Sequence, residues 1–145
     1  MKRLILVRYG QYESGHLTAE GISTMEKAAS RFGSIATGTN RLLAANTPRA
    51  VESAAVLAPV LETQVEPLDE LYAAEEDGRL PDSAHAWQLL QSLGEDCDTL
   101  VAVVSREYIE DLPSLILDQK VQISLDRGQC LVIDLNAKTI SYLRD

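Results

Sequence analysis

The chain has 145 residues, of which 46% are hydrophobic, and it carries a formal net charge of −9 at pH 7. This length and apolar content suit a single domain over residues 1–145, and the acidic balance argues against binding nucleic acid through a general positive field. The first ten residues lack the apolar run and cleavage site of a signal peptide, and no segment approaches membrane-spanning length, so we expect a cytoplasmic protein without a membrane partner.

Short apolar runs alternate with amphipathic segments along the sequence. Strands are predicted for the apolar runs, at residues 2–7, 41–45, 64–66, 99–104, 129–135 and 139–144. Helices are predicted for the segments between them, at residues 17–32, 47–61, 83–93 and 107–118. Thr18 and Thr47 are suitable N-caps for the first two helices, and Pro48 suits the first helical position.

This alternation predicts an α/β fold, a three-layer sandwich in which helices flank a mostly parallel central sheet. The last two strands are separated by residues 136–138 only, which predicts a C-terminal hairpin at one edge of the sheet. Residues 75–83 form the longest stretch without a periodic pattern, and we expect a mobile loop there.

Cysteine and histidine are scarce. Cys97 and Cys130 each lie beside or within an apolar run, which favours buried free thiols in a reducing cytoplasm over a disulfide. His16 and His85 are the only histidines, and no spacing between them and the cysteines suits zinc. We therefore expect no metal and no other cofactor.

Three arginines follow predicted strands. Arg8 follows the first strand, Arg49 lies in the first turn of the second helix, and Arg106 follows the strand at 99–104. Ligands of open α/β sheets bind at the carboxyl ends of the strands, and guanidinium groups suit phosphate oxygens. A cation in a first helical turn opposes the helix dipole, so a bound anion would offset the cost at Arg49. The alternative is pairing with nearby carboxylates, for which the candidates are Glu52, Glu70 and Glu107.

Four short motifs occur in a fixed order. Arg8-Tyr9-Gly10 follows the first strand, and "LTAEG" over residues 17–21 begins the first helix. "AANTPRAVESA" spans residues 44–54, and "VAVVSREYI" spans residues 101–109. Over nearly the whole chain these resemble the histidine phosphatase superfamily, the phosphoglycerate mutase-like group that includes the small phosphohistidine phosphatases. The family motifs are Arg-His-Gly, Leu-Thr-x-x-Gly, Ser-Ser-Pro-x-x-Arg-Ala-x-Gln-Thr-Ala, and Val-Ser-His or Val-Gly-His.

The resemblance implies a phosphoglycerate mutase-like fold and a known chemistry. In the family a phosphoryl group moves to the first histidine, arginines and a second histidine bind its oxygens, and a carboxylate protonates the leaving group. Here Tyr9 occupies the nucleophile position, and Glu70 the acid position, for which residues 75–77 are alternatives. The phosphate-binding positions hold Arg8, Arg49, Arg106 and, if the alignment shifts by one residue, Ser105.

Both family histidines are therefore replaced. A tyrosine with a pKa near 10 is only about a thousandth ionised at pH 7, whereas an arginine in place of the second histidine keeps anion affinity. We expect a pseudo-phosphatase with an arginine-lined anion pocket, in a binding or regulatory role for a phosphorylated small molecule or phosphoprotein. Tyr12 either lines that pocket or covers apolar surface.

Two other functions fit the sequence. One is a phosphomonoesterase or protein phosphohistidine phosphatase with a non-standard nucleophile, for which the candidates are Tyr9, Glu13, His16 and His85. The other is a structural or interaction domain whose pocket has lapsed. Arginines paired with carboxylates in a closed site would favour the second of these.

Overall fold

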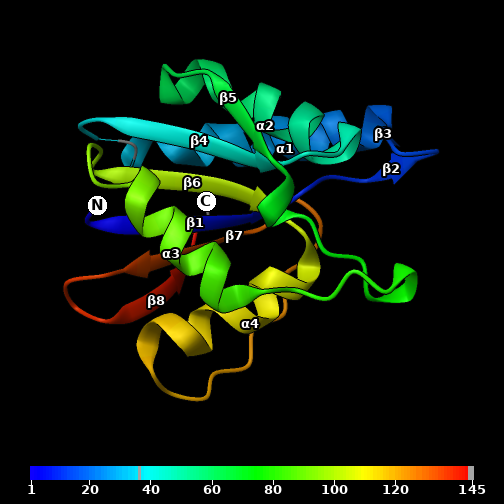
Figure 1. The fold of residues 1–145 in the computed structure, drawn as a ribbon. Helices are drawn as coiled ribbons and strands as arrows, with labels where there is room; N and C mark the ends of the chain where they lie inside the picture. Colours follow the sequence, from blue (N-terminus) through cyan, green and yellow to red (C-terminus); the bar gives the residue numbers. More distant parts are fainter. Residues whose placement is uncertain (36, 144–145) are drawn as a thin grey trace.

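A computed structural model of the chain describes residues 1–35 and 37–143. Six strands form one sheet in the order β5-β4-β6-β1-β7-β8 (Figure 1). The strands are β1 (Arg3–Arg8), β4 (Asn40–Ala45), β5 (Val65–Leu68), β6 (Thr99–Val104), β7 (Cys130–Asp134) and β8 (Thr139–Tyr142). The helices are α1 (Ala19–Arg31), α2 (Pro48–Leu61), α3 (Ser83–Leu93) and α4 (Arg106–Leu117).

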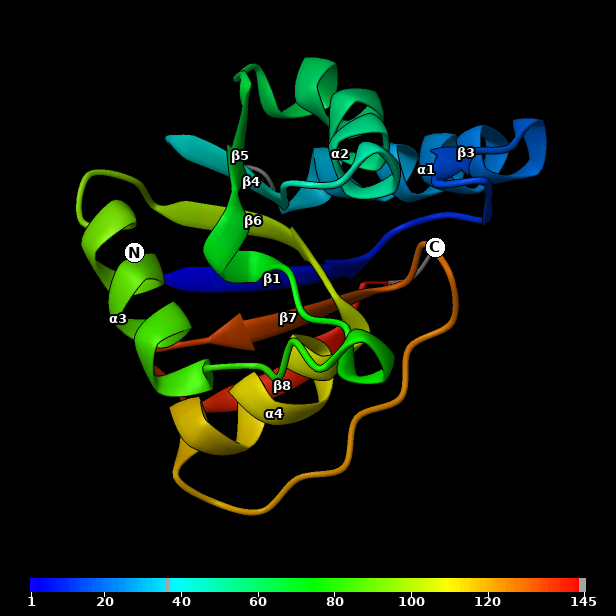
Figure 2. The same ribbon diagram turned by 45° about the vertical axis from the view of Figure 1, so that its right-hand side comes forward.

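Helices cover both faces of the sheet. Figures 1 and 2 show α1 and α2 packed together on one face, and α3 and α4 on the other. The middle strands are accordingly buried: all six residues of β6 and the four inner residues of β1 are inaccessible to solvent. Continuous apolar strands of this kind are typical of sheets covered on both sides. The predicted three-layer α/β sandwich is confirmed.

The direction of the strands places the ends of several strands, and the starts of two helices, at one end of the sheet. β5, β4, β6 and β1 are parallel, β7 is antiparallel to β1, and β8 is antiparallel to β7. The C-terminal hairpin predicted for one edge is therefore confirmed. Arg8 is level with Val104, and Ala44 with Val103, so β1, β4 and β6 end together. α2 directly follows β4, and α4 directly follows β6, so the first turns of both helices lie at this end of the strands.

Local capping explains where the helices begin. The Thr18 hydroxyl oxygen accepts from the Gly21 amide at 3.1 Å, and that of Thr47 from the Ala50 amide at 3.4 Å. Pro48 is the first residue of α2, as predicted. Ser105 is the N-cap residue of α4, so this helix begins at Arg106, one residue before its predicted start.

The structure differs from the prediction in three places. A short hairpin, β2 (Tyr12–Glu13) and β3 (His16–Leu17), turns through Ser14 and Gly15 at φ 52° and 84°. Strands of two residues show no periodicity, so the sequence pattern missed them. Residues 75–83 hold a short 3-10 helix, η3 (Glu75–Asp77), and the longer irregular segment is 118–129. β8 ends at Tyr142, and the predicted final position, 144, lies outside the described residues.

Candidate functional site

The end of β1 is fixed by close backbone packing. A Cβ atom on Gly10 would lie 2.7 Å from the Gly21 carbonyl oxygen, a distance at which the backbone of α1 would have to move. The Gly10 amide also donates to the buried Ser53 hydroxyl of α2 at 3.1 Å. Both glycines of the family-like motifs therefore allow the residue between Arg8 and Gly10 to be held against two helices. That residue is Tyr9, which is only 9% exposed.

Arg8 faces the segment between α4 and β7. Its guanidinium group donates to the Leu125 carbonyl oxygen. Burial lowers the pKa of Arg8, and the nearby positive charge of Arg127 lowers it further. Beside Arg8 and Arg106 lies a cavity of about 30 Å³. This volume holds about one water molecule and is too small for a phosphate ion.

Arg106 begins α4 and already has a carboxylate partner. Its Nη1 lies 2.8 Å from Glu110 Oε1, one helical turn further on. The hydrogen bond that Arg106 donates to Glu110 raises the pKa of Arg106. Of the three arginines that the sequence indicates, this one is neutralised locally.

Arg49 lies among aromatic rings. Its guanidinium carbon is 5.2 Å from the ring centroid of Tyr9, 4.7 Å from that of Tyr12 and 5.9 Å from that of Tyr72. Burial is the largest single effect on the pKa of Arg49 and lowers it, but hydrogen bonding and charge interactions with Tyr9, Tyr12 and Tyr72 together raise it above its usual value. Its Nε is buried without a hydrogen-bond partner. Among residues 1–35 and 37–143, no carboxylate forms an ion pair with Arg49.

A fourth arginine joins this group. The guanidinium carbon of Arg127 lies 5.3 Å from the Tyr9 ring centroid and 4.9 Å from that of Tyr12. The two tyrosine rings meet edge to face, with centroids 5.5 Å apart. Sequence reasoning missed Arg127, although one signal was available: if β7 pairs antiparallel with β1, the residues just before β7 lie beside the end of β1.

The other residues that the sequence indicates have different surroundings. Ser105 is 2% exposed, and its hydroxyl oxygen accepts from the Ala73 amide at 3.0 Å. Glu70 lies exposed in the 3-10 helix η2 (Asp69–Leu71). Within the described part of the chain, neither a hydrogen bond nor an ion pair joins the Glu70 carboxylate to an arginine. The structure thus brings Arg8, Tyr9 and Arg49 to one edge and leaves Glu70 on the surface.

The start of α4 holds the loop that precedes α3 through a series of contacts. The buried Glu107 carboxylate accepts from the Glu75 amide at 3.1 Å, and the Tyr108 hydroxyl accepts from the Asp82 amide at 3.2 Å. Together with the Ser105 contact, these bonds fix the loop over residues 72–82. This loop carries Tyr72, which contacts Arg49, and Arg79, whose guanidinium carbon lies 5.0 Å from the Tyr72 ring centroid.

The alternative nucleophiles lie elsewhere. His16 Nδ1 is 2.8 Å from Glu52 Oε2, and Glu52 Oε1 accepts from the Leu17 amide at 2.8 Å, which ties the β2–β3 hairpin to α2. The bond to His16 is the main cause of the lowered pKa of Glu52. Glu13 and His85 are exposed, on β2 and α3 respectively.

The chemistry available at Tyr9 follows from its neighbours. Its ring contacts two guanidinium groups and one other phenol. These partners supply positive charge and N–H donors, which suit binding of an oxyanion, rather than a base that would take the phenolic proton. In the described residues, no group of three or more His, Cys, Asp or Glu side chains could hold a metal ion, and no helix is long and apolar enough to cross a membrane.

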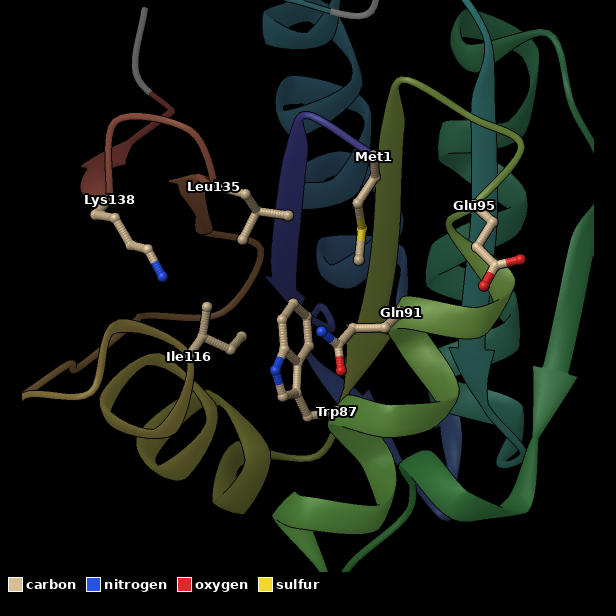
Figure 3. Close-up of a pocket in the computed structure, with 7 residues that line it drawn as sticks. All are labelled: Met1, Trp87, Gln91, Glu95, Ile116, Leu135 and Lys138. Atoms are coloured by element: carbon tan, nitrogen blue, oxygen red, sulfur yellow. The ribbon is translucent and has the colours of Figure 1, made fainter.

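A separate pocket of about 490 Å³ lies between α3, α4 and the β7–β8 hairpin (Figure 3). Trp87 and Gln91 of α3 line it together with Met1, which precedes β1. Leu135 and Lys138, which lie after the end of β7 and before β8, close its other side. The pocket is therefore at the end of the sheet where β1 begins, opposite the arginines.

Comparisons with known proteins address the fold. The sequence matches no protein-family model, and no curated protein matches it. Solved structures do match. The protein histidine phosphatase SixA, complexed with tungstate, aligns with a TM-score of 0.77 at 14% identity, over 97% of this chain and 93% of that one.

Two further matches have similar statistics. A mutant phosphoserine phosphatase from Entamoeba histolytica, in complex with phosphoserine, aligns with a TM-score of 0.73 at 17% identity, over 99% of this chain and 96% of that one. A mycobacterial glucosyl-3-phosphoglycerate phosphatase with inorganic phosphate gives 0.73 at 15% identity, over 98% and 95% of the two chains. The chain therefore has the phosphoglycerate mutase-like fold of the histidine phosphatase superfamily, the family that its sequence motifs resemble.

Proposed function

We propose that the protein is a pseudo-phosphatase that binds a phosphorylated small molecule or phosphoprotein through arginines at the end of β1 and the start of α2. The observation that carries this proposal is the state of Arg49. It lies in the first turn of α2, no carboxylate of the described residues pairs with it, and its Nε is buried without a partner. The tyrosine rings stabilise this charge, but a cation in a first helical turn still opposes the helix dipole, and a bound anion would offset that cost.

The structural neighbours support an oxyanion as the ligand. The three matched structures hold tungstate, phosphoserine and inorganic phosphate. All three are compact tetrahedral oxyanions or carry such a group. The same chemistry suits the guanidinium groups of Arg8 and Arg49 here.

Binding is a better proposal than turnover because of two side chains. Tyr9 stands where the family has its nucleophilic histidine, and its contacts are with cations and a phenol rather than a base. Arg106 stands at the second histidine position and is paired with Glu110. The free thiols of Cys97 and Cys130 fit a reducing cytoplasm, where we place this binding role.

Thermal unfolding with inorganic phosphate tests the proposal. At ten times the dissociation constant, one bound ion stabilises the native state by about 1.4 kcal/mol, which raises Tm by several degrees for a chain of this size. We expect this rise relative to sodium chloride of equal ionic strength. Arg49→Ala should remove it, whereas Lys27→Ala, the same charge change at an exposed position of α1, should retain it.

A parallel assay with p-nitrophenyl phosphate separates binding from catalysis. We expect hydrolysis no faster than background, because the histidines of the family are replaced. Robust hydrolysis that Tyr9→Phe abolishes would show an enzyme with a tyrosine nucleophile. If about 20 mM phosphate leaves Tm unchanged, the lapsed pocket of an interaction domain is the better description.

A further inference from the structure

We propose that Arg127 is an additional anion-binding residue, and that Arg49 and Arg127 hold one phosphoryl dianion between them beside Tyr9 and Tyr12. This inference rests on the proposed function and deepens it. Arg127 belongs to none of the four motifs that carry the family resemblance. It comes from the irregular segment between α4 and β7, which passes close to the end of β1 (Figure 2).

The turn that carries Arg127 is bonded to the same strand end as Tyr9. The Gly128 amide donates to the Arg8 carbonyl oxygen at 2.8 Å, and the Arg8 amide donates to the Gln129 carbonyl oxygen at 3.1 Å. The turn closes on itself, because the Asp126 amide donates to the Gln129 side chain at 2.8 Å. Gly128 has φ of 75°, which the turn requires and which other residues rarely adopt. The backbone of Arg127 is therefore positioned by β1, the strand that directly precedes Tyr9.

The side chains of Arg127 and Arg49 meet the same two rings. Both guanidinium carbons lie within 5 Å of the Tyr12 centroid, at 4.9 Å and 4.7 Å, and slightly farther from that of Tyr9. The two cations therefore border the same pair of rings, and Arg127 is also close enough to Arg8 to lower its pKa. In the part of the chain that the structure describes, neither Arg49 nor Arg127 has an ion pair.

Each of the two arginines also has a hydrogen-bond donor that is not used within the protein. Arg49 Nε and Arg127 Nη1 are buried atoms without a partner. An oxyanion bound between the two guanidinium groups would accept from both donors and would cancel the repulsion of the two charges. The charge of the two arginines matches a dianion, such as a phosphomonoester above its second pKa of about 6.

A purely structural role is the competing explanation for Arg127. A guanidinium group over tyrosine rings stabilises the folded chain by cation–π attraction, with no ligand needed. Such a role predicts that substitution lowers stability in chloride buffer and leaves phosphate affinity unchanged. The ligand-binding role predicts a loss of affinity.

Titration calorimetry with inorganic phosphate at pH 7.5 and with p-nitrophenyl sulfate, a monoanion, distinguishes these roles. We expect Arg127→Gln to raise the phosphate Kd at least about tenfold, and Arg127→Lys, which keeps the charge without the planar fork, to raise it less. We expect a much smaller effect on the monoanion. Circular dichroism checks that each variant is folded, and Lys27→Ala serves as the control for charge.

The outcomes separate the two proposals. If the native protein does not bind phosphate, the proposed function itself fails. If it binds, and Arg49→Ala loses binding while folded Arg127→Gln and Arg127→Lys retain native affinity, the anion site stands and the role of Arg127 is overturned. An equal loss for the dianion and the monoanion would overturn the dianion assignment.

Discussion

Tyr9 contacts positive charge from two separate segments of the chain: Arg49 on α2, and Arg127 just before β7. A phenol in these surroundings can donate a hydrogen bond to a bound oxyanion. An imidazole at the same place could instead accept a phosphoryl group as a nucleophile. Under the proposed function, Tyr9 is therefore a binding group and not a nucleophile. The cysteines show how strongly burial sets the reactivity of other single residues in the same chain.

Burial raises the pKa of the Cys130 thiol to about 12, and it also raises the pKa of the half-buried Cys97. We expect iodoacetamide at pH 8 to label native Cys97 slowly and Cys130 only after unfolding in urea, as read by peptide mass spectrometry. Because the folded pKa of Cys130 exceeds the unfolded value of 9.0, the stability linked to it is complete below pH 9 and declines as the pH rises toward 12. Rapid labelling of Cys130 in the native protein would contradict its burial.

At the level of elements, the end of β1 depends on the contact between two backbones. Gly10 and Gly21 allow the strand to approach α1 so closely that either Cβ atom would overlap the other segment. The same residues carry the Arg-Tyr-Gly and Leu-Thr-x-x-Gly motifs. Both glycines are therefore explained by packing, without reference to any ligand.

Gly10→Ala should destabilise the protein by about 1–3 kcal/mol, because α1 or β1 must shift to admit the methyl group. Gly33→Ala is the matched control, since a Cβ atom there meets nothing within 4 Å. Urea unfolding followed by circular dichroism compares the two. Equal midpoints for both variants would show that β1 and α1 separate more easily than the close contact implies.

Over the whole molecule, charge and ion pairs act in opposite directions as the pH falls. The net charge of −9 at pH 7 shrinks toward the sequence pI of about 4.6, which relieves repulsion. Below that pH, carboxylates that form ion pairs become protonated, and the ion pairs are lost. Glu66 is one of them: hydrogen bonds from Arg41 Nε and Nη2, both 2.7 Å long, lower its pKa and join β5 to β4.

The stability that Glu66 contributes is present above its unfolded pKa of 4.5 and is lost as the pH falls through its lower folded pKa. We therefore expect Tm to fall more steeply below pH 4.5 in the native protein than in Glu66→Gln. Glu26→Gln, at an exposed position of α1, should follow the native curve. Parallel Tm curves for the native protein and Glu66→Gln between pH 3 and 6 would exclude this contribution.

Most of the fold could be predicted from the sequence because apolar runs and helix caps are local patterns. β1 and β6 are continuous apolar runs, and Thr47 with Pro48 marks the start of α2. The motifs also indicated Arg8, Tyr9 and Arg49. Arg127 could not be found this way, because only the tertiary pairing of β7 with β1 brings it to Tyr9. Likewise, no local pattern shows that Ser105 and Glu107 bond the loop over residues 72–82.

Those bonds between the start of α4 and the loop before α3 join two parts of the surface. Ser105, Glu107 and Tyr108 accept from three amides spread along residues 73–82, so the loop is anchored to the first turn of the helix. Leu80 of this loop is 71% exposed, and Tyr72 at its start contacts Arg49. An exposed apolar side chain and a ring that contacts the arginine site therefore lie on one anchored segment.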